Sequence, residues 1–179
     1  AMVVTNRPQH VPWWTWNITK QTRKPDEVIV ATNFGYMLEE DEEAFAETVK
    51  HLLPGIQTQF VFLPEDASIG ELRQETLFRS RGDIVNYVDD DDWYHPWLFK
   101  VFEDRIIRQR YDLATAPGHH RLLLNDLTTF QFMEIYDLIH LPFCAVRGSL
   151  ARKIRFIPES LDEDIKWLEQ ISNFVRDNR

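Results

Sequence analysis

Residues 82–96 read Gly-Asp-Ile-Val-Asn-Tyr-Val-Asp-Asp-Asp-Asp-Trp-Tyr-His-Pro, and this stretch decides the fold. An apolar run over 84–88, typical of a buried strand, ends abruptly in four carboxylates, Asp89 to Asp92. Four adjacent negative charges repel one another, so the cluster is costly unless water or a cation relieves it. Water is scarce at the end of a buried strand, and a hard divalent cation with oxygen ligands is then the natural partner.

This acidic tetrad has two interpretations. It can be a solvated turn, because charge runs are usually solvated faces. The strand before it and the Trp-Tyr-His-Pro sequence after it favour a metal site instead. In such a site one or two carboxylates hold Mg²⁺ or Mn²⁺, and phosphate oxygens complete the shell. Asp89, Asp91 and Asp92 are the strongest candidates.

On both sides of this stretch, predicted strands alternate with predicted helices. Strands are expected at 2–5, 28–31, 59–63 and 83–88, and helices at 8–22, 39–53, 69–81 and 96–110. Gly82 is expected to close the third helix as a left-handed cap, and Pro96 to stand in the first turn of the fourth. The alternation predicts an α/β fold with a mainly parallel sheet flanked by helices. Ligands of such sheets bind beyond the carboxyl ends of the strands.

After residue 111 the pattern changes to short strands and one closing helix. Further strands, some of them paired as a hairpin, are expected at 112–117, 121–124, 128–133 and 143–147. The closing helix, 165–175, carries one apolar stripe formed by Ile165, Leu168, Ile171 and Val175. No linker and no internal repeat interrupts the chain, so we expect a single domain over 1–179.

Composition excludes several classes of protein. The chain has 179 residues, 44% of them apolar, which suits one globular domain with a real core. A formal net charge of -9 argues against a large nucleic-acid footprint. Cys144 is the single cysteine, so no intrachain disulfide is possible and a reducing compartment is expected. No apolar run approaches the roughly 20 residues that span a bilayer, and the start has no signal-like core. We therefore expect a soluble, cytoplasmic protein.

Four segments, in order, resemble family 2 glycosyltransferases of the GT-A fold. They are Val4-Thr5-Asn6-Arg7-Pro8 with the helix and strand that follow it, Gly70-Glu71-Leu72-Arg73-Gln74, the stretch 82–96 with its Asp-x-Asp-Asp metal motif, and Asp162-Glu163-Asp164-Ile165-Lys166-Trp167-Leu168. The first three cover 2–100 closely, and the last is a shorter match to the late acidic motif of the family. The resemblance implies a GT-A (nucleotide-diphospho-sugar transferase) fold. Its nucleotide-binding half would be 2–110 and its acceptor and catalytic half 111–179.

The same resemblance implies a role for each matching residue. The residues that would bind the nucleotide or the donor sugar are Thr5, Asn6, Arg7, Asn33, Arg73, Asp89, Asp90 and Asp92. Asp89 and Asp91 would hold the metal, Mn²⁺ or Mg²⁺, and Asp164 would be the general base. Family members often carry an Asp at the end of the second strand. Here Thr32-Asn33 stands instead, so the sequence leaves open which nucleotide base is bound.

The chemistry fits these residue types independently of the family. Displacing a nucleoside diphosphate builds negative charge that a divalent cation stabilises, and a placed carboxylate helps the incoming hydroxyl lose its proton. The predicted function is metal-dependent, inverting transfer of a sugar from a nucleoside-diphosphate sugar, with a UDP-sugar favoured. The acceptor hydroxyl would belong to a glycan, a protein or a modified base in nucleic acid.

Two other functions stay open. A non-catalytic module would keep the metal and nucleotide-sugar pocket without turnover. A sugar nucleotidyltransferase would typically carry a glycine-rich loop after the first strand, and Thr5-Asn6-Arg7-Pro8 is not such a loop.

Some candidate residues also have plainer interpretations. Ser160 and Glu163 can form a capping box at the start of the closing helix, which would account for part of the late acidic motif. His119 or His120 can be a further metal ligand or a surface turn. Three neighbouring tryptophans can stack a base or a sugar, or pack in the core or an interface: Trp13, Trp14 and Trp16.

Overall fold

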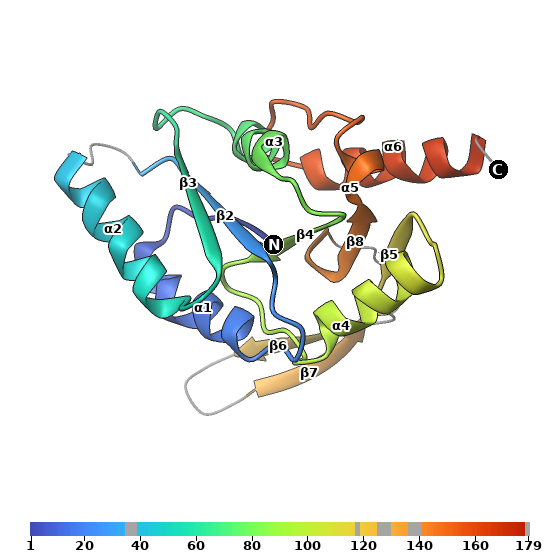
Figure 1. The fold of residues 1–179 in the computed structure, drawn as a ribbon, viewed down its shortest axis with the longest axis horizontal. Coiled ribbons are helices and arrows are strands. Elements are labelled where there is room, and N and C mark those ends of the chain that lie inside the picture. Colours follow the sequence, from blue (N-terminus) through green and yellow to red (C-terminus); the bar gives the residue numbers. More distant parts are fainter. Residues whose placement is uncertain (35–38, 117–118, 125–129, 136–140, 178–179) are drawn as a thin grey trace.

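A six-stranded sheet forms the centre of the molecule, with its strands in the order β3-β2-β1-β4-β8-β5 (Figure 1). Strands β1 to β4 run parallel to one another, whereas β8 is antiparallel to both β4 and β5. The strands of this sheet are β1 (Met2–Val4), β2 (Glu27–Thr32), β3 (Gln57–Phe62), β4 (Ile84–Asp89), β5 (Leu113–Thr115) and β8 (Cys144–Arg147). A separate antiparallel pair joins β6 (His119–Leu124) to β7 (Phe130–Ile135).

This computed structural model describes residues 1–34, 39–116, 119–124, 130–135 and 141–177. The main helices are α1 (Val11–Thr19), α2 (Glu39–Leu52), α3 (Ile69–Arg79), α4 (Leu98–Glu103) and α6 (Glu163–Asp177). Shorter helical segments are η1 (Pro8–His10), η2 (Asp104–Arg108), η3 (Leu141–Phe143) and α5 (Gly148–Ala151). None of the described helices is long and apolar enough to cross a membrane.

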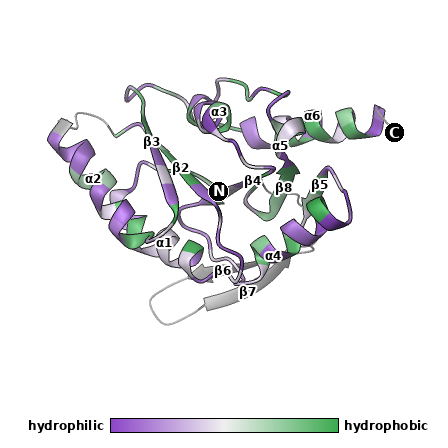
Figure 2. Ribbon diagram, viewed as in Figure 1, coloured by the Kyte–Doolittle hydropathy of each residue, from purple (hydrophilic) through white to green (hydrophobic). Residues whose placement is uncertain are grey.

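Helices cover both faces of the sheet and enclose two apolar cores. On one face α1, α2 and α4 contribute Trp14, Phe45 and Phe102. On the other face α3 and α6 contribute Leu72 and Trp167. Because helices bury both faces of β2, its sequence is a continuous apolar run rather than an alternation. Figure 2 shows the matching pattern on α2 and α6, where hydrophobic residues recur among hydrophilic ones.

The predicted fold class is confirmed, because the sheet is mostly parallel and is flanked by helices. All four strands predicted before residue 90 are present, each within two residues of its expected start. The strands predicted after residue 111 are also present. β6 and β7 form a hairpin of their own, and β5 and β8 extend the central sheet.

The predicted left-handed cap at Gly82 is wrong. Helix α3 ends at Arg79, and its C-cap, Ser80, is extended, with φ -67° and ψ 140°. Among the described glycines, Gly55 is the one with a positive φ, 77°. The Gly82 N–H instead donates to the Glu27 carboxylate at 2.9 Å, so Gly82 belongs to the connection between helix and strand.

Two expectations about helix N-termini, Pro96 in the first turn of the fourth helix and Ser160 as the cap of the closing helix, are also wrong. The fourth helix begins at Leu98, because the Leu98 N–H donates to the His95 carbonyl at 2.9 Å and so leaves Pro96 in the preceding turn. After Glu103 that helix widens into the π-helical segment η2.

At the closing helix, Ser160 is not the cap, because α6 begins at Glu163 and the Ser160 hydroxyl accepts from the Ile69 N–H at 3.3 Å. A capping box is formed instead by Ser68 and Glu71 at the start of α3. Ile165, expected on the apolar stripe of α6, is 45% exposed.

The register of the sheet brings the predicted site residues to one edge. Val4 is paired with Ala31 of β2 on one side and with Asp89 of β4 on the other. Thr5, Thr32 and Asp90 follow these residues directly, so the carboxyl ends of three parallel strands meet here. This is the edge at which sheets of this kind bind ligands.

Candidate active site

The tetrad does not act as four equivalent carboxylates. Asp90 is 1% exposed and accepts hydrogen bonds from the Thr5 hydroxyl and the Arg7 guanidinium, both of which follow β1. A second Arg7 nitrogen donates to Asp91 at 2.9 Å. Half of the Asp91 side chain is exposed. Arg7 therefore joins the end of β1 to the end of β4 and neutralises the buried charge of Asp90.

Asp89 is the last residue of β4, and its side chain is 37% exposed. Burial raises the pKa of Asp89 to about 7; Arg73 works in the opposite direction, and the carboxylates of Asp92, Asp91 and Asp164 add to the rise. The backbone N–H of Asp89 donates to the Tyr94 hydroxyl at 2.8 Å, which fixes the strand end. A cation beside Asp89 would favour its ionised form.

Arg73 connects α3, on which it lies, with the end of β4 and the start of α6. Its guanidinium lies 2.5 Å from the Glu163 carboxylate, 3.6 Å from Asp89 and 4.0 Å from Asp164. It lies over the ring of Tyr87. The guanidinium is buried, and its Nε has no hydrogen-bond partner among the described residues. Arg73 of α3 thus brings Asp89 of β4 and Asp164 of α6 to one place.

The start of α6 presents two acids with different environments. Glu163 is 4% exposed and is committed to Arg73, whereas the Asp164 side chain is 23% exposed. In the sequence, Glu163 was considered as part of a helix cap, and its ion pair with Arg73 was not predicted. No sequence signal indicated this partner, because the burial of Arg73 is visible only in the structure.

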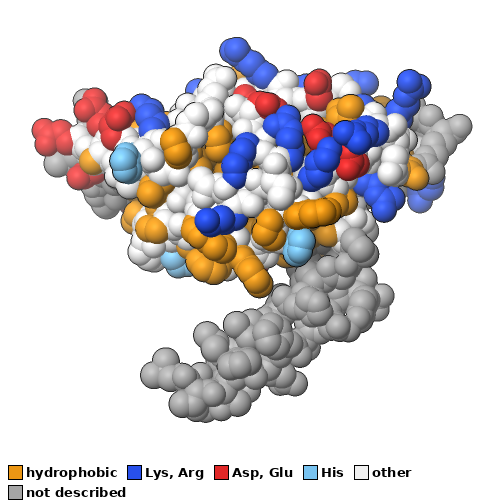
Figure 3. All heavy atoms as spheres, turned by 60° about the horizontal axis from the view of Figure 1, so that its bottom comes forward, with side chains coloured by type: hydrophobic (Ala, Val, Ile, Leu, Met, Phe, Trp, Pro, Cys, Tyr) orange, Lys and Arg blue, Asp and Glu red, His pale blue; other side chains and the backbone are white. Residues whose placement is uncertain are grey.

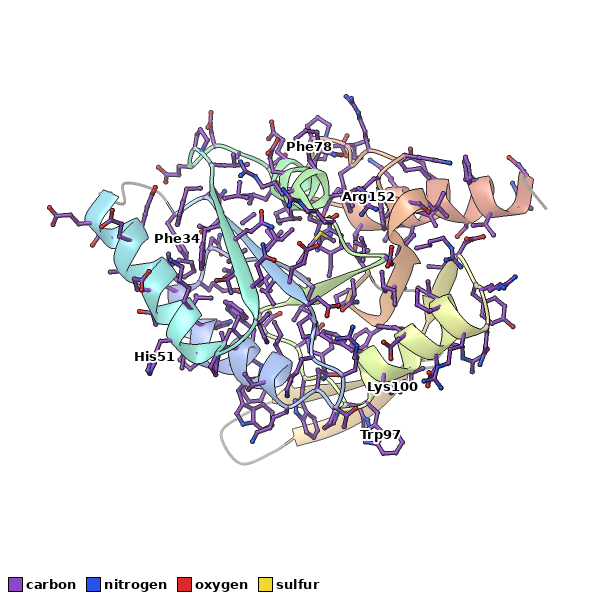
Figure 4. The ribbon with its side chains drawn as sticks, viewed as in Figure 1. Phe34, His51, Phe78, Trp97, Lys100 and Arg152 are labelled. Atoms are coloured by element: carbon purple, nitrogen blue, oxygen red, sulfur yellow. The ribbon has the colours of Figure 1, made fainter. Side chains whose placement is uncertain are left out.

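A pocket of about 960 Å³ opens next to the carboxyl ends of β1 and β2. Its lining includes Asn6, Asn33, Phe34 and Glu65. Figure 4 places Phe34 between α2 and the sheet, and its ring meets that of Phe45 edge-on at 5.1 Å. The Asn33 amide donates to the Glu65 and Ala67 carbonyls at 3.3 and 2.9 Å, which ties β2 to the connection before α3.

The predicted nucleotide residues thus divide between two neighbouring places. Asn6 and Asn33 line the pocket, whereas Thr5 and Arg7 contact the tetrad. The Asp92 backbone carbonyl accepts from Trp13 and Asn17 of α1. His119 and His120 begin β6, and their side chains lie outside the described residues. Within the part of the chain that the structure describes, no three or more His, Cys, Asp or Glu side chains are grouped as a ready metal site.

Comparison with known proteins shows what this chain is similar to. No protein-family model and no curated protein sequence matches the chain. Among solved structures, TarS 1–349 from S. aureus has a TM-score of 0.68 at 17% identity and covers 95% of this chain. TarS 1–349 in complex with UDP-GlcNAc has a TM-score of 0.59 at 18% identity and covers 87% of this chain. HddC from Yersinia pseudotuberculosis has a TM-score of 0.55 at 8% identity and covers 90% of this chain.

These likenesses establish the fold, which this chain shares with TarS and HddC. The chain spans about half the length of TarS 1–349: the matched region covers 53% of that protein. It matches 82% of HddC.

Proposed function

We propose that the chain is a glycosyltransferase that moves a sugar from a nucleoside-diphosphate sugar to an acceptor hydroxyl, with inversion. The observation that carries the proposal is the convergence of Asp89 and Asp164 on Arg73, at the carboxyl edge of the sheet. The pocket lined by Asn6 and Asn33 lies at the same edge and offers space for a nucleoside. TarS, which shares the fold, has been solved with UDP and with UDP-GlcNAc, which supports a UDP-sugar as donor.

A divalent cation, Mn²⁺ or Mg²⁺, belongs to this proposal, and the donor set fits it. Asp89 and Asp91 are hard oxygen ligands, and they would hold the ion. Such ions usually take one or two carboxylates and complete their shell with water and phosphates, so a preformed cluster of three protein ligands is not required. When bound, the ion supplies positive charge against the diphosphate that leaves. Asp90 is not assigned this role, because it is 1% exposed and accepts from both Thr5 and Arg7, whereas Asp91 accepts from Arg7 and half of its side chain is exposed.

The residues of the chain would divide the remaining work. Asp164 would accept the proton of the acceptor hydroxyl, and its partial exposure leaves it accessible from the site. Arg73, paired with Glu163, would hold Asp164 and Asp89 in position. A single displacement needs no second carboxylate nucleophile, so the product would have the inverted configuration.

The metal and nucleotide assignment is tested with Asp91→Ala. We expect UDP with Mn²⁺ to raise the melting temperature of the wild-type protein, because a ligand that binds the folded form stabilises it. The Asp91→Ala variant should lose the part of this rise that depends on Mn²⁺. Asp26→Ala is a matched control, because Asp26 is also an exposed carboxylate paired with an arginine but lies at the amino end of β2. An undiminished Mn²⁺ effect in Asp91→Ala, measured by calorimetry, removes the assignment.

The general base is tested with Asp164→Asn. We expect kcat for transfer to fall by about 10²–10⁴, the usual contribution of a positioned base, while the Kd for the donor stays unchanged. Asp162→Asn is the control, because Asp162 is exposed, and its φ of 61° is a conformation that asparagine tolerates. Full transfer activity in Asp164→Asn contradicts the base assignment. Donor binding without transfer or hydrolysis by the wild-type protein supports the binding-module alternative.

A further inference from the structure

The six tryptophans of the chain fall into two groups. Trp14 and Trp167 are 0% and 1% exposed and belong to the cores. The other four are between 43% and 67% exposed: Trp13, Trp16, Trp93 and Trp97. These four lie on α1 or in the loop over 92–97 that follows the tetrad. Large exposed apolar side chains gathered in one area mark a binding surface more often than chance.

Hydrogen bonds hold α1 and this loop side by side. The Asn17 amide donates to the Asp92 carbonyl at 3.1 Å and accepts from the Tyr94 N–H at 3.0 Å. Just after α1, the Thr22 N–H donates to the Pro96 carbonyl at 2.7 Å. The two segments that carry the exposed tryptophans are therefore fixed relative to each other, and the surface is formed before any ligand arrives.

The Trp13 ring is held by a hydrogen bond at its edge and stacks on the Trp16 ring. Trp13 and Trp16 are nearly parallel, with an interplanar angle of 15° and ring centroids 5.9 Å apart. The Trp13 Nε1–H donates to the Asp92 carbonyl at 2.9 Å, which uses the edge of the ring rather than its face. Figure 3 shows hydrophobic side chains gathered on the face that carries α1 and α4, and Figure 4 shows Trp97 projecting from it.

We infer that these four residues, the tryptophan platform, bind the acceptor as a chain of sugar rings. This inference rests on the proposed glycosyl transfer and names the substrate class of the same site. A pyranose ring has an apolar C–H face and a polar rim, so it can lie on an indole face while its hydroxyl groups stay in water. The bond from Trp13 to Asp92 places the platform directly against the tetrad, where the donor is proposed to bind.

The surrounding charges favour a saccharide over a nucleic acid. Aromatic faces also stack bases, but single-stranded nucleic acid needs cations along its backbone. Near the platform, Arg23 is already paired with Asp26 and Glu103, while Lys20 lies over the Trp16 ring at 5.8 Å. The platform borders four consecutive carboxylates, and the whole chain has a net charge of -9. A neutral sugar chain meets no such repulsion.

Binding to the platform is tested with oligomers of glucose, mannose, galactose and N-acetylglucosamine, without donor or metal. We expect at least one oligomer to shift the tryptophan fluorescence of the wild-type protein. Trp16→Ala and Trp97→Ala should each weaken that binding about tenfold, as expected for the loss of one stacking partner. Phe78→Ala is the control, because Phe78 is a 78% exposed aromatic on α3, on the opposite edge in Figure 4.

Several outcomes overturn the inference. They are binding of no oligomer, equal binding by the tryptophan variants, binding of oligothymidine or anionic vesicles in place of the oligomers, and a dimer that Trp16→Ala dissociates. The proposed function is measured separately, by UDP with Mn²⁺ in the same variants. If the wild-type protein binds UDP but no oligomer, only the tryptophan platform is rejected. If the wild-type protein does not bind UDP with Mn²⁺, the proposed function is rejected.

Discussion

At the scale of single residues, the ion pair between Arg73 and Glu163 decides how the site is supported. Glu163 lies 2.5 Å from Arg73 in a buried environment, and Arg73 in turn lies near Asp89 and Asp164. Removing one partner of a buried pair leaves an uncompensated charge, which costs more than the pair itself contributes. Glu163 is therefore expected to position the two functional carboxylates rather than to contact a substrate.

Glu163→Gln tests this positioning role. We expect the free energy of unfolding to fall by about 1–3 kcal/mol, and kcat to fall more than KM rises, because the residue acts on the geometry of Asp164. Glu159→Gln is the control, since Glu159 forms an exposed pair with Lys166 at 2.7 Å and such pairs contribute little. Glu163→Asp should recover part of kcat. A variant that loses stability but keeps kcat shows that the pair is structural.

The raised pKa of Asp89, about 7, predicts how metal binding depends on pH. A proton and a cation compete for the same carboxylate, so the affinity for Mn²⁺ should fall as pH falls from 8 to 6, by up to about tenfold per pH unit below the pKa. The same group affects stability. Because its pKa is higher in the folded protein than in the unfolded chain, the stability that it contributes is fully present below about pH 4 and is lost as pH rises through about 7.

Calorimetric titration with Mn²⁺ at pH 6, 7 and 8 measures the first effect. Urea unfolding of the wild-type protein and of Asp89→Asn from about pH 4 to pH 8 measures the second, because that range contains both the unfolded and the folded pKa. The variant should lose Mn²⁺ binding and should gain stability relative to the wild type as pH rises. An affinity that does not change with pH contradicts the raised pKa.

At the scale of elements, the position of α3 against the segment before α6 sets the distance between Arg73 and Glu163. The Gly70 N–H donates to the Glu159 carbonyl at 2.8 Å, and a Cβ at position 70 would lie 1.9 Å from the Ile157 carbonyl oxygen. Only glycine allows this close approach of helix and backbone. The glycine therefore contributes to the site, although it lies outside it.

Gly70→Ala tests the packing of these two elements. The added methyl group must push α3 away from 157–159, so we expect the free energy of unfolding to fall by about 1–3 kcal/mol, as for other overpacked sites. Transfer activity should fall as well, because Arg73 lies one turn along the same helix. Glu75→Ala on α3 is the control, because its pair with Arg79 is partly exposed and loose, at 3.8 Å. Wild-type stability in Gly70→Ala, measured by urea unfolding, contradicts the close approach.

At the scale of the whole molecule, the sequence predicted the sheet because local signals and long-range packing agree there. β2 and β4 are apolar runs of the right length, and Pro54 with Gly55 ends α2 where expected. The site was predictable in its location but not in its internal division. Asp89 to Asp92 look alike in sequence, and only contacts with Thr5 and Arg7, more than eighty residues away, bury Asp90, while half of the Asp91 side chain stays exposed.

The placement of β1 has a consequence for how the chain is made. β1 has three residues and is enclosed by β2 on one side and β4 on the other. A ribosome releases the N-terminus first, so β1 can pair with β2 early, but its other edge stays open until Asp89 has been synthesised. An unpaired strand edge can pair with another chain and so promotes aggregation of nascent chains. Premature termination before Ile84 should therefore yield fragments that chaperones hold or proteases remove, rather than a smaller working protein.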